Sequence, residues 1–273
     1  MKLSVAYSPC PNDTFTFYGL ATGRIELPVD CFGGSLEIET RLHDVETLNR
    51  MALDGVCDVT KLSFHAWLQV RDSYQLLRVG ATLGRGCGPL VVARALPGGP
   101  RPPLGRIAVP GEHTTAHLLF RLWAPDSRNL VFVPYDRIMG MVANGEVDAG
   151  VIIHEGRFVY RQRGLACLVD LGDWWEAQTG LPIPLGCIAA RKTLGEACIA
   201  GCEEMIEQSL RLALRNPSAP QDYIKQHAQE LDDEVIRQHI ATYVNEFSLD
   251  LGATGRAAVA ALESLAREEG GGQ

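Results

Sequence analysis

The sequence has no long hydrophobic segment. No run of about 18 apolar residues occurs in it, and a helix needs about that length to cross a bilayer. Residues 1–9 also lack a charged segment followed by a sustained apolar one, which would mark a secretory signal. We therefore expect a cytoplasmic protein without a membrane partner.

Paired cysteines and an excess of basic residues are missing as well. The eight cysteines form no CxxC pair, so without a secretion signal they are predicted to be buried thiols rather than disulfides. The 25 Lys and Arg residues are outnumbered by 33 Asp and Glu residues, which gives a net charge of −8. An acidic chain without a basic stripe is repelled by nucleic acid and anionic membranes, so neither is an expected partner.

Common catalytic and metal motifs are absent too. The sequence contains neither the GxSxG nor the P-loop pattern, and residues 84–88 (GRGCG) depart from the dinucleotide pattern GxGxxG. His113 and His117 have the i, i+4 spacing of metal ligands on a helix, but no Glu lies between them and no third ligand is near. We predict no metal site.

What the sequence does contain is an alternation of short β-branched runs with helical patterns, followed beyond Thr193 by helices alone. This alternation is typical of βαβ units with parallel sheets, and it predicts an α/β fold. Strands are predicted over residues 3–7, 36–41, 58–62, 76–79, 90–94, 106–109, 130–133, 148–153, 166–169 and 186–190. Helices are predicted over residues 14–22, 45–54, 63–69, 115–122, 137–143, 195–215, 219–230, 232–243 and 254–267.

Two segments of the chain echo one another. Residues 44–60 and 136–150 each read as a helix, then Gly-x-x-Asp beginning at Gly55 or Gly145, then a buried strand. Two similar halves would give two parallel-sheet α/β domains around a cleft, the architecture of the periplasmic-binding-protein-like fold of type II. The alternative is two unrelated helix–strand units that share a common turn.

This architecture implies a discontinuous larger domain. Residues 1–94 and 187–273, with the C-terminal helices, are expected to form the larger domain, and residues 95–186 the smaller one. The Pro- and Gly-rich segment 95–105 is the expected first crossover, and residues 181–186 the expected return.

Polar residues follow four of the predicted strands. Ligands of open parallel α/β sheets bind at the carboxyl ends of the strands, and helix N-termini there favour an anion through their free N–H groups and dipole. We therefore expect these ends to bind a small-molecule carboxylate. The candidate residues are Asn12, Asp13 and Thr14; Lys61, Leu62 and Ser63; Thr114, Thr115 and Ala116; and His154.

Each candidate also has a simpler interpretation. Ser63 and Thr114 could serve only as helix caps, and Lys61 could extend along the surface with its amine in water. A single buried histidine such as His154 is usually a core residue bonded to the backbone. The convergence of four strand ends on one cleft favours the functional interpretation.

These strand ends and several other segments match a known family. They read SPCPNDTF at 8–15, DVETLN at 44–49, TKLS at 60–63, GRG at 84–86, GPLVVAR at 88–94, HTTA at 113–116, IIHE at 152–155, DLGDWWE at 170–176, TGLP at 179–182, TYVN at 242–245 and FSLD at 247–250. In them the chain resembles the 1,4-dihydroxy-6-naphthoate synthases of the futalosine route to menaquinone. The resemblance covers nearly the whole chain, and SPCPNDTF and IIHE are its most specific segments.

The resemblance implies a cytosolic enzyme with a type II binding-protein fold and no metal or organic cofactor. The implied reaction is a carbon–carbon lyase step that converts cyclic de-hypoxanthinyl futalosine into 1,4-dihydroxy-6-naphthoate and expels a sugar-derived fragment. It assigns the role of proton acceptor to His154, whose pKa would be about 6.5 if unperturbed. It assigns substrate contacts to Lys61-Leu62-Ser63 and Thr115-Ala116.

Two other functions remain open at this point. One is a non-catalytic protein of the same fold that binds a small anion, which the missing export signal disfavours. The other is a chorismate dehydratase, a sibling enzyme of the same pathway, which is disfavoured by SPCPNDTF and by the His154-Glu155 pair.

Overall fold

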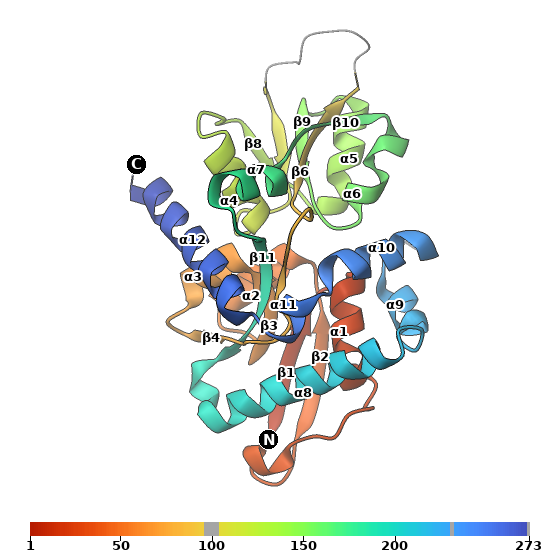
Figure 1. Cartoon of the computed structure of the whole chain (residues 1–273), viewed down its shortest axis with the longest axis vertical. Helices are drawn as coiled ribbons and strands as arrows, with labels where there is room; N and C mark the ends of the chain where they lie inside the picture. Colours follow the sequence, from red (N-terminus) through yellow and green to blue (C-terminus); the bar gives the residue numbers. More distant parts are fainter. Residues whose placement is uncertain (96–103, 230–231, 272–273) are drawn as a thin grey trace.

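The strands of the computed structural model form two sheets, one in each of two lobes stacked along the long axis (Figure 1). The structure describes residues 1–95, 104–229 and 232–271. The first lobe, lower in Figure 1, holds a six-stranded sheet, and the second lobe holds a five-stranded one. The chain crosses to the second lobe after β5 (Thr82–Gly84) and returns just before β11 (Ile183–Arg191).

The first sheet has the order β2-β1-β3-β11-β4, with β5 also paired to β11. Strands β1, β2 and β3 are parallel, whereas β11 runs antiparallel to its partners β3, β4 and β5. Besides β5 and β11, the strands are β1 (Lys2–Tyr7), β2 (Glu37–Leu42), β3 (Val59–Ser63) and β4 (Tyr74–Leu76).

Helices from both ends of the chain cover this sheet. Helix α1 begins with Pro11, whose fixed φ suits the first helical position, and its apolar residues share a core cluster with β1 and α8. The helices of this lobe are α1 (Pro11–Ala21), α2 (Val45–Leu53), α3 (Phe64–Val70), α8 (Glu196–Arg215), α9 (Gln221–His227), α10 (Asp233–Tyr243), α11 (Glu246–Leu249) and α12 (Gly252–Gly271), with 3-10 turns η1 (Val29–Phe32) and η3 (Lys192–Leu194).

The second sheet repeats the topology of the first. Its order read from one edge, β8-β7-β9-β6-β10, has three parallel strands followed by the antiparallel strand β6. The strands are β6 (Leu90–Arg94), β7 (Ile107–Val109), β8 (Leu130–Phe132), β9 (Ala149–Ile152) and β10 (Leu165–Asp170). The helices are α4 (Thr115–Trp123), α5 (Tyr135–Asn144), α6 (Gly156–Val159) and α7 (Leu171–Thr179), with the 3-10 turn η2 (Tyr160–Arg163).

The repeated topology accounts for the echo in the sequence. Helices α2 and α5 each precede the central parallel strand of their own sheet, and Gly55 and Gly145 follow these helices with φ of 65° and 77°. Residues with a Cβ rarely adopt this left-handed conformation, which explains glycine at both positions. The predicted α/β fold with two sheets is confirmed, except that β6, β10 and β11 make antiparallel pairs within sheets predicted to be parallel.

The predicted crossover after residue 94 is wrong. Strand β6 (Leu90–Arg94) pairs with β9 and β10 in the second sheet, so the chain has already changed lobes before residue 90. Most of the segment 95–105 lies outside the described residues, and the strands on either side of it, β6 and β7, both belong to the second sheet. On the return, β11 joins the first sheet at Ile183, four residues ahead of the predicted limit at 187.

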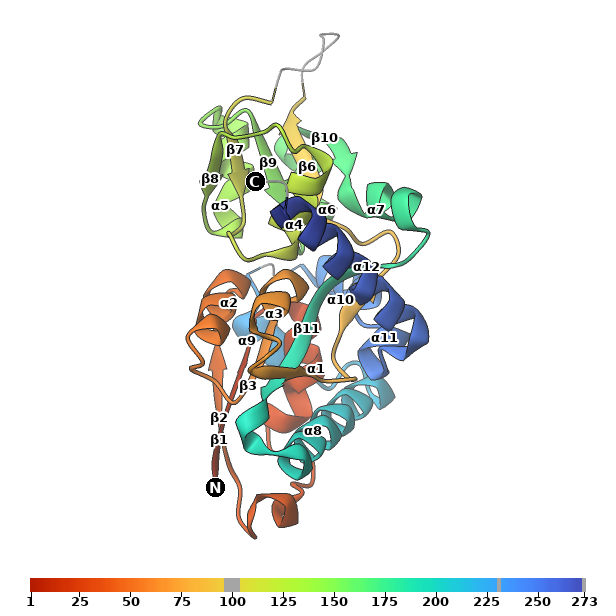
Figure 2. The same ribbon diagram turned by 90° about the vertical axis from the view of Figure 1, so that its left-hand side faces the viewer.

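The last helix, α12, spans the junction of the two lobes (Figure 2). Glu263 of this helix pairs with Arg71 at the end of α3, and Glu269 pairs with Arg121 of α4. The C-terminal helix therefore contacts both lobes. Among the described helices, none is long and apolar enough to cross a membrane.

Candidate functional site

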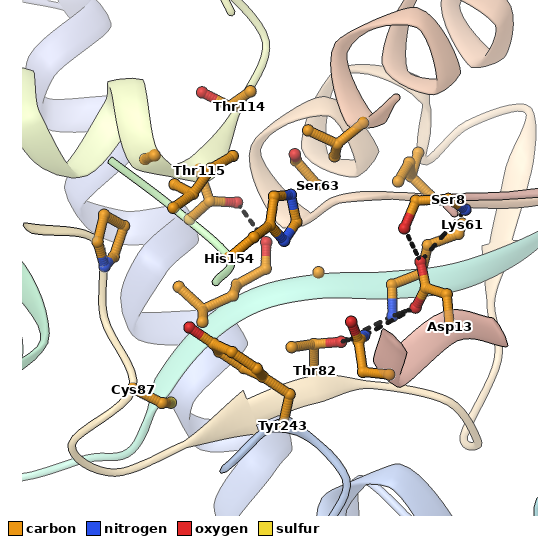
Figure 3. Close-up of a pocket in the computed structure, with 18 residues that line it drawn as sticks. Ser8, Asp13, Lys61, Ser63, Thr82, Cys87, Thr114, Thr115, His154 and Tyr243 are labelled. Atoms are coloured by element: carbon orange, nitrogen blue, oxygen red, sulfur yellow. Dashed lines mark hydrogen bonds and ion pairs between the residues drawn. The ribbon is translucent and has the colours of Figure 1, made fainter. Parts of the chain in front are cut away.

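A pocket that is partly open to solvent lies where the two lobes meet (Figure 3). It is formed around the carboxyl ends of β1, β3, β7 and β9, the four strand ends expected from the sequence. The residues that line it are Ser8, Asn12, Asp13, Val45, Lys61, Leu62, Ser63, Thr82, Cys87, Pro89, Thr114, Thr115, Ala116, Ile153, His154, Leu185, Gly186 and Tyr243.

All of the predicted site residues line this pocket except Thr14. Its hydroxyl donates a hydrogen bond to the Cys10 carbonyl at 3.0 Å, and its side chain is fully buried. The predicted helix began at residue 14, but Pro11 starts α1 three residues earlier. Thr14 therefore lies inside the helix, and Asn12 and Asp13 occupy its first turn beside the pocket.

Lys61 is buried and fully engaged by the protein. Its Nζ lies 3.0 Å from Asp13 Oδ1 and donates to Thr82 Oγ1 at 2.7 Å and to the Gly80 carbonyl at 3.2 Å. An ammonium has three N–H donors, and these acceptors use all of them. In this structure Lys61 therefore does not offer a free donor to a substrate carboxylate, and it holds Asp13 in place (Figure 3).

Asp13 is the centre of a wider polar network. Its carboxylate also accepts hydrogen bonds from Ser8 Oγ at 2.6 Å and from Asn12 Nδ2 at 2.9 Å. The amide oxygen of Asn12 is paired with His239 Nε2 at 2.9 Å. The buried carboxylate of Asp13 needs these partners, because burying a charge without hydrogen-bond or charge partners costs free energy through desolvation.

The hydroxyls of Thr114 and Thr115 are also occupied. Thr114 caps α4, accepting from the His117 N–H and donating to the Gly111 carbonyl. Thr115 Oγ1 donates to the Leu185 carbonyl at 2.7 Å and accepts from the His65 N–H at 3.2 Å. The N–H groups of Thr115 and Ala116, in the first turn of α4, have no intrahelical partner, so here the backbone is better placed to bind an anion than the hydroxyls.

Ser63 keeps one hydrogen-bonding group available. Its Oγ accepts from Asn49 Nδ2 at 3.1 Å, and its N–H donates to Asn49 Oδ1 at 2.8 Å. The hydroxyl proton is not used by these bonds, and Ser63 makes no side-chain cap to α3. Ser63 can therefore donate to a ligand in the pocket.

His154 lies two residues beyond the end of β9 and has unusual backbone geometry. Its φ of 56° is the only positive φ outside glycine among the described residues. Strained conformations of this kind cost about 1–3 kcal/mol and are concentrated at functional sites. The ring makes an edge contact with Tyr135, at 4.8 Å between centroids, and Nε2 has no hydrogen-bond partner in the described part of the chain.

The environment of His154 keeps its imidazole neutral. Burial lowers its pKa to about 4, and the positive charge of Lys61 acts in the same direction, against the opposing effects of Asp13 and Asp44. The unperturbed value of about 6.5 expected from the sequence is therefore too high. The imidazole is in its proton-accepting form at neutral pH, and an anionic ligand beside it would raise its pKa again.

Some pocket residues, and His239, which bonds the pocket residue Asn12, were not among the site residues predicted from the sequence. His239 of α10 is fully buried, its ring lies 6.2 Å from that of His154, and its Nδ1 has no partner among the described residues. Thr82 comes from β5, Cys87 from the crossover that follows it, and Tyr243 from the end of α10. They come from segments that sequence periodicity assigned to a loop or to an ordinary amphipathic helix.

In the described residues, His113 and His117 are not grouped with a third potential metal ligand. His117 Nδ1 is paired with the Glu112 carbonyl at 2.7 Å, and its ring packs edge-on against Phe132. Within the described ranges, no group of three His, Cys, Asp or Glu side chains is arranged to hold a metal ion.

The buried histidines predict that the protein loses stability in mild acid. Burial lowers the pKa of His65 and of His154 to about 4, and it also lowers those of His117 and His239. The unfolded chain, with histidine pKa near 6.5, then binds protons more readily than the folded one, so stability is full above about 6.5 and falls as the pH drops towards 4. We expect a loss of roughly 1–3 kcal/mol each from His65 and His154.

Urea unfolding at pH 7.5, 6.0 and 5.0 measures this loss. The His154→Asn variant is the matched control, because it should show a shallower decline over the same range. A free energy of unfolding that is independent of pH from 7.5 to 5.0 would contradict the assignment of these residues as neutral.

A two-lobed α/β protein with its pocket at the lobe junction belongs to the periplasmic-binding-protein-like class. A Candida albicans protein described as having that generic fold aligns with a TM-score of 0.69 and 12% identity, over 98% of this chain and 90% of its own, which shows the fold alone. A crystal structure from Archaeoglobus fulgidus aligns with a TM-score of 0.91 and 37% identity over 98% of both chains.

The sequence relatives identify the family. Residues 3–268 match the family described as Menaquinone biosynthesis. The 1,4-dihydroxy-6-naphthoate synthase of Thermus thermophilus is 53% identical, over 98% of this chain and 95% of its own length, and that of Streptomyces coelicolor is 45% identical, over 98% and 94%. The chain belongs to the 1,4-dihydroxy-6-naphthoate synthase family of menaquinone biosynthesis.

Proposed function

We propose that this chain is a carbon–carbon lyase that converts cyclic de-hypoxanthinyl futalosine into 1,4-dihydroxy-6-naphthoate, with His154 as the general base. The observation that carries the proposal is the state of His154. The residue lines the pocket, and its backbone has a strained, positive φ. Its imidazole is neutral, and Nε2 has no hydrogen-bond partner among the described residues. An imidazole nitrogen that has no hydrogen-bond partner among the described residues can take a proton from a ligand.

In this proposal, the N-terminus of α4 and Ser63 bind the substrate carboxylate. The free N–H groups of Thr115 and Ala116 lie at the positive end of the α4 dipole. The Ser63 hydroxyl lines the same pocket from the other lobe. A carboxylate bound by these donors would contact both lobes and favour their closure around the substrate.

The proposed reaction suits these groups. Cleavage of a carbon–carbon bond next to a carbonyl, followed by aromatisation, requires a base and donors that stabilise the developing enolate or phenolate oxygen. His154 is the base in this proposal, and donors at the lobe junction stabilise the oxyanion. Closure of the lobes would exclude water and orient the leaving fragment.

The decisive experiment is an incubation of the purified protein with cyclic de-hypoxanthinyl futalosine. We expect 1,4-dihydroxy-6-naphthoate to appear, detected by its absorbance and by mass spectrometry. Chorismate serves as the comparison substrate and should remain unchanged. Binding of the futalosine derivative without turnover would support a non-catalytic binding protein instead, and dehydration of chorismate would support the sibling enzyme.

A further inference from the structure

One carboxylate reaches from the first lobe to the backbone of the second. Glu46, in the first turn of α2, accepts hydrogen bonds from the N–H groups of Glu112 and His113, each at 3.1 Å. Both donors lie in the loop between β7 and α4 of the second lobe. The Glu46 side chain is only 12% exposed. It also forms an ion pair with Arg50, whose Nε lies 3.4 Å from Glu46 Oε1 and whose side chain is largely in solvent. The interlobe bonds therefore dominate its surroundings.

Gly111 shows how closely the loop approaches this carboxylate. A Cβ placed on Gly111 would lie 2.5 Å from Oε2 of Glu46, far inside van der Waals contact. A side chain at this position requires either the loop or the Glu46 carboxylate to move. The fit between Gly111 and Glu46 therefore depends on the present separation of the lobes.

The same carboxylate is linked to the pocket on both sides. On the first lobe, Asn49 Nδ2 donates to Glu46 Oε2 at 3.3 Å and to Ser63 Oγ at 3.1 Å. On the second lobe, Thr114 follows the bound loop directly, and its hydroxyl donates to the Gly111 carbonyl and caps α4. Glu46 is thus joined to Ser63 through one residue and to the α4 N-terminus through one loop.

We propose that Glu46 is a positioning residue that holds the two lobes in the relative position of this structure and so brings Ser63 and the α4 N-terminus onto the same substrate. It does not touch the reacting atoms, because it is absent from the pocket lining. The part of this proposal that concerns substrate rests on the proposed function. The part that concerns the lobes rests on the contacts of Glu46 alone.

The first experiment uses no substrate. Hydrogen–deuterium exchange of the peptide that contains residues 111–114 should be slow in the wild type, because Glu46 binds the Glu112 and His113 N–H groups. Glu46→Gln should accelerate this exchange, since the amide presents a donor where one carboxylate oxygen accepted. Glu37→Gln, an exposed carboxylate of the same lobe, is the matched control and should leave the exchange unchanged.

A second variant disturbs the closure without altering the carboxylate. Gly111→Ala should displace the loop or the Glu46 carboxylate, weaken the bonds to the Glu112 and His113 N–H groups, and accelerate the same exchange. Gly140→Ala is the control in the same lobe, because a Cβ there meets no atom within 4 Å. Small-angle scattering of the ligand-free proteins should give larger radii of gyration for Glu46→Gln and Gly111→Ala than for the wild type and both controls.

Turnover supplies the third readout. Loss of one charge-assisted hydrogen bond at the closure should raise KM for the futalosine derivative about ten- to a hundredfold, with a smaller effect on kcat. Unchanged exchange and unchanged radii in both variants would overturn the proposal, as would a fall in kcat with KM unaltered. If the wild type does not turn over the substrate, the proposed function fails, whereas the exchange and scattering results still decide the role of Glu46.

Discussion

Replacing His154 by Asn is expected to lower kcat by about 10²–10⁴-fold, with a much smaller change in the dissociation constant of the substrate. Asparagine cannot take a proton at neutral pH, but it fills part of the same space. It also tolerates the left-handed conformation that His154 adopts at φ 56°. The variant should therefore fold normally, and steady-state kinetics together with equilibrium binding would measure the two effects separately.

The competing interpretation of His154 as a core histidine makes the opposite forecast. It requires a lower melting temperature and a normal kcat in the fraction that remains folded. His227→Asn is a suitable control, because this histidine packs edge-on against Tyr223 and does not line the pocket. A wild-type kcat in the His154→Asn variant would show that His154 is not the general base.

The position of His154 could be predicted from sequence because strand ends are local features. A run of apolar β-branched residues marks β9, and the first polar residue after such a strand lies at the sheet edge. The strained backbone and the lowered pKa could not be predicted in the same way. They arise from residues brought in by the fold, such as Tyr135 beside the ring and Lys61 from the other lobe.

The lobe limits show the same difference: features set by neighbouring residues could be predicted from the sequence, whereas features set by residues far along the chain could not. Leu90–Arg94 was predicted as a strand with the bounds that the structure has. Its assignment to the wrong sheet arose because strand pairing depends on partners far along the chain, here β9 and β10. The three-residue strand β5, which pairs with β11 beside the crossover, is too short to show a periodic pattern.

Lys61 illustrates how a correct residue can have a role different from the expected one. Its place at the end of β3 predicted a pocket cation, and Lys61 does line the pocket. The ion pair between Lys61 and Asp13 could not be predicted, because the two residues lie on different elements and do not belong to a common sequence motif. The proposed anion site consequently relies on backbone N–H groups of α4 and on Ser63 more than on this ammonium.

The largest expected change in stability comes from breaking the buried ion pair between Lys61 and Asp13. Replacing Lys61 by Met should lower the free energy of unfolding by about 3–5 kcal/mol, because it leaves the Asp13 carboxylate buried without a counter-charge. The side chains of Lys61 and Asp13 are only 9% and 4% exposed, so water cannot compensate for the loss. Lys2→Met, which breaks the solvent-exposed pair with Glu39, is the control and should change stability little.

The double variant Asp13→Asn, Lys61→Met separates a lost charge partner from lost packing. Removing both charges should recover most of the stability, because a buried ion pair replaced as a unit is often close to neutral. The amide introduced by Asp13→Asn would still accept from Ser8, although it would meet Asn12 Nδ2 less favourably than the carboxylate does. Urea unfolding of both single variants and the double variant gives the coupling energy directly. A double variant as unstable as Lys61→Met alone would give a different result. It would show that the packing of the Lys61 stem and the hydrogen bonds from Nζ to Gly80 and Thr82 stabilise the pocket more than the charge pair with Asp13 does.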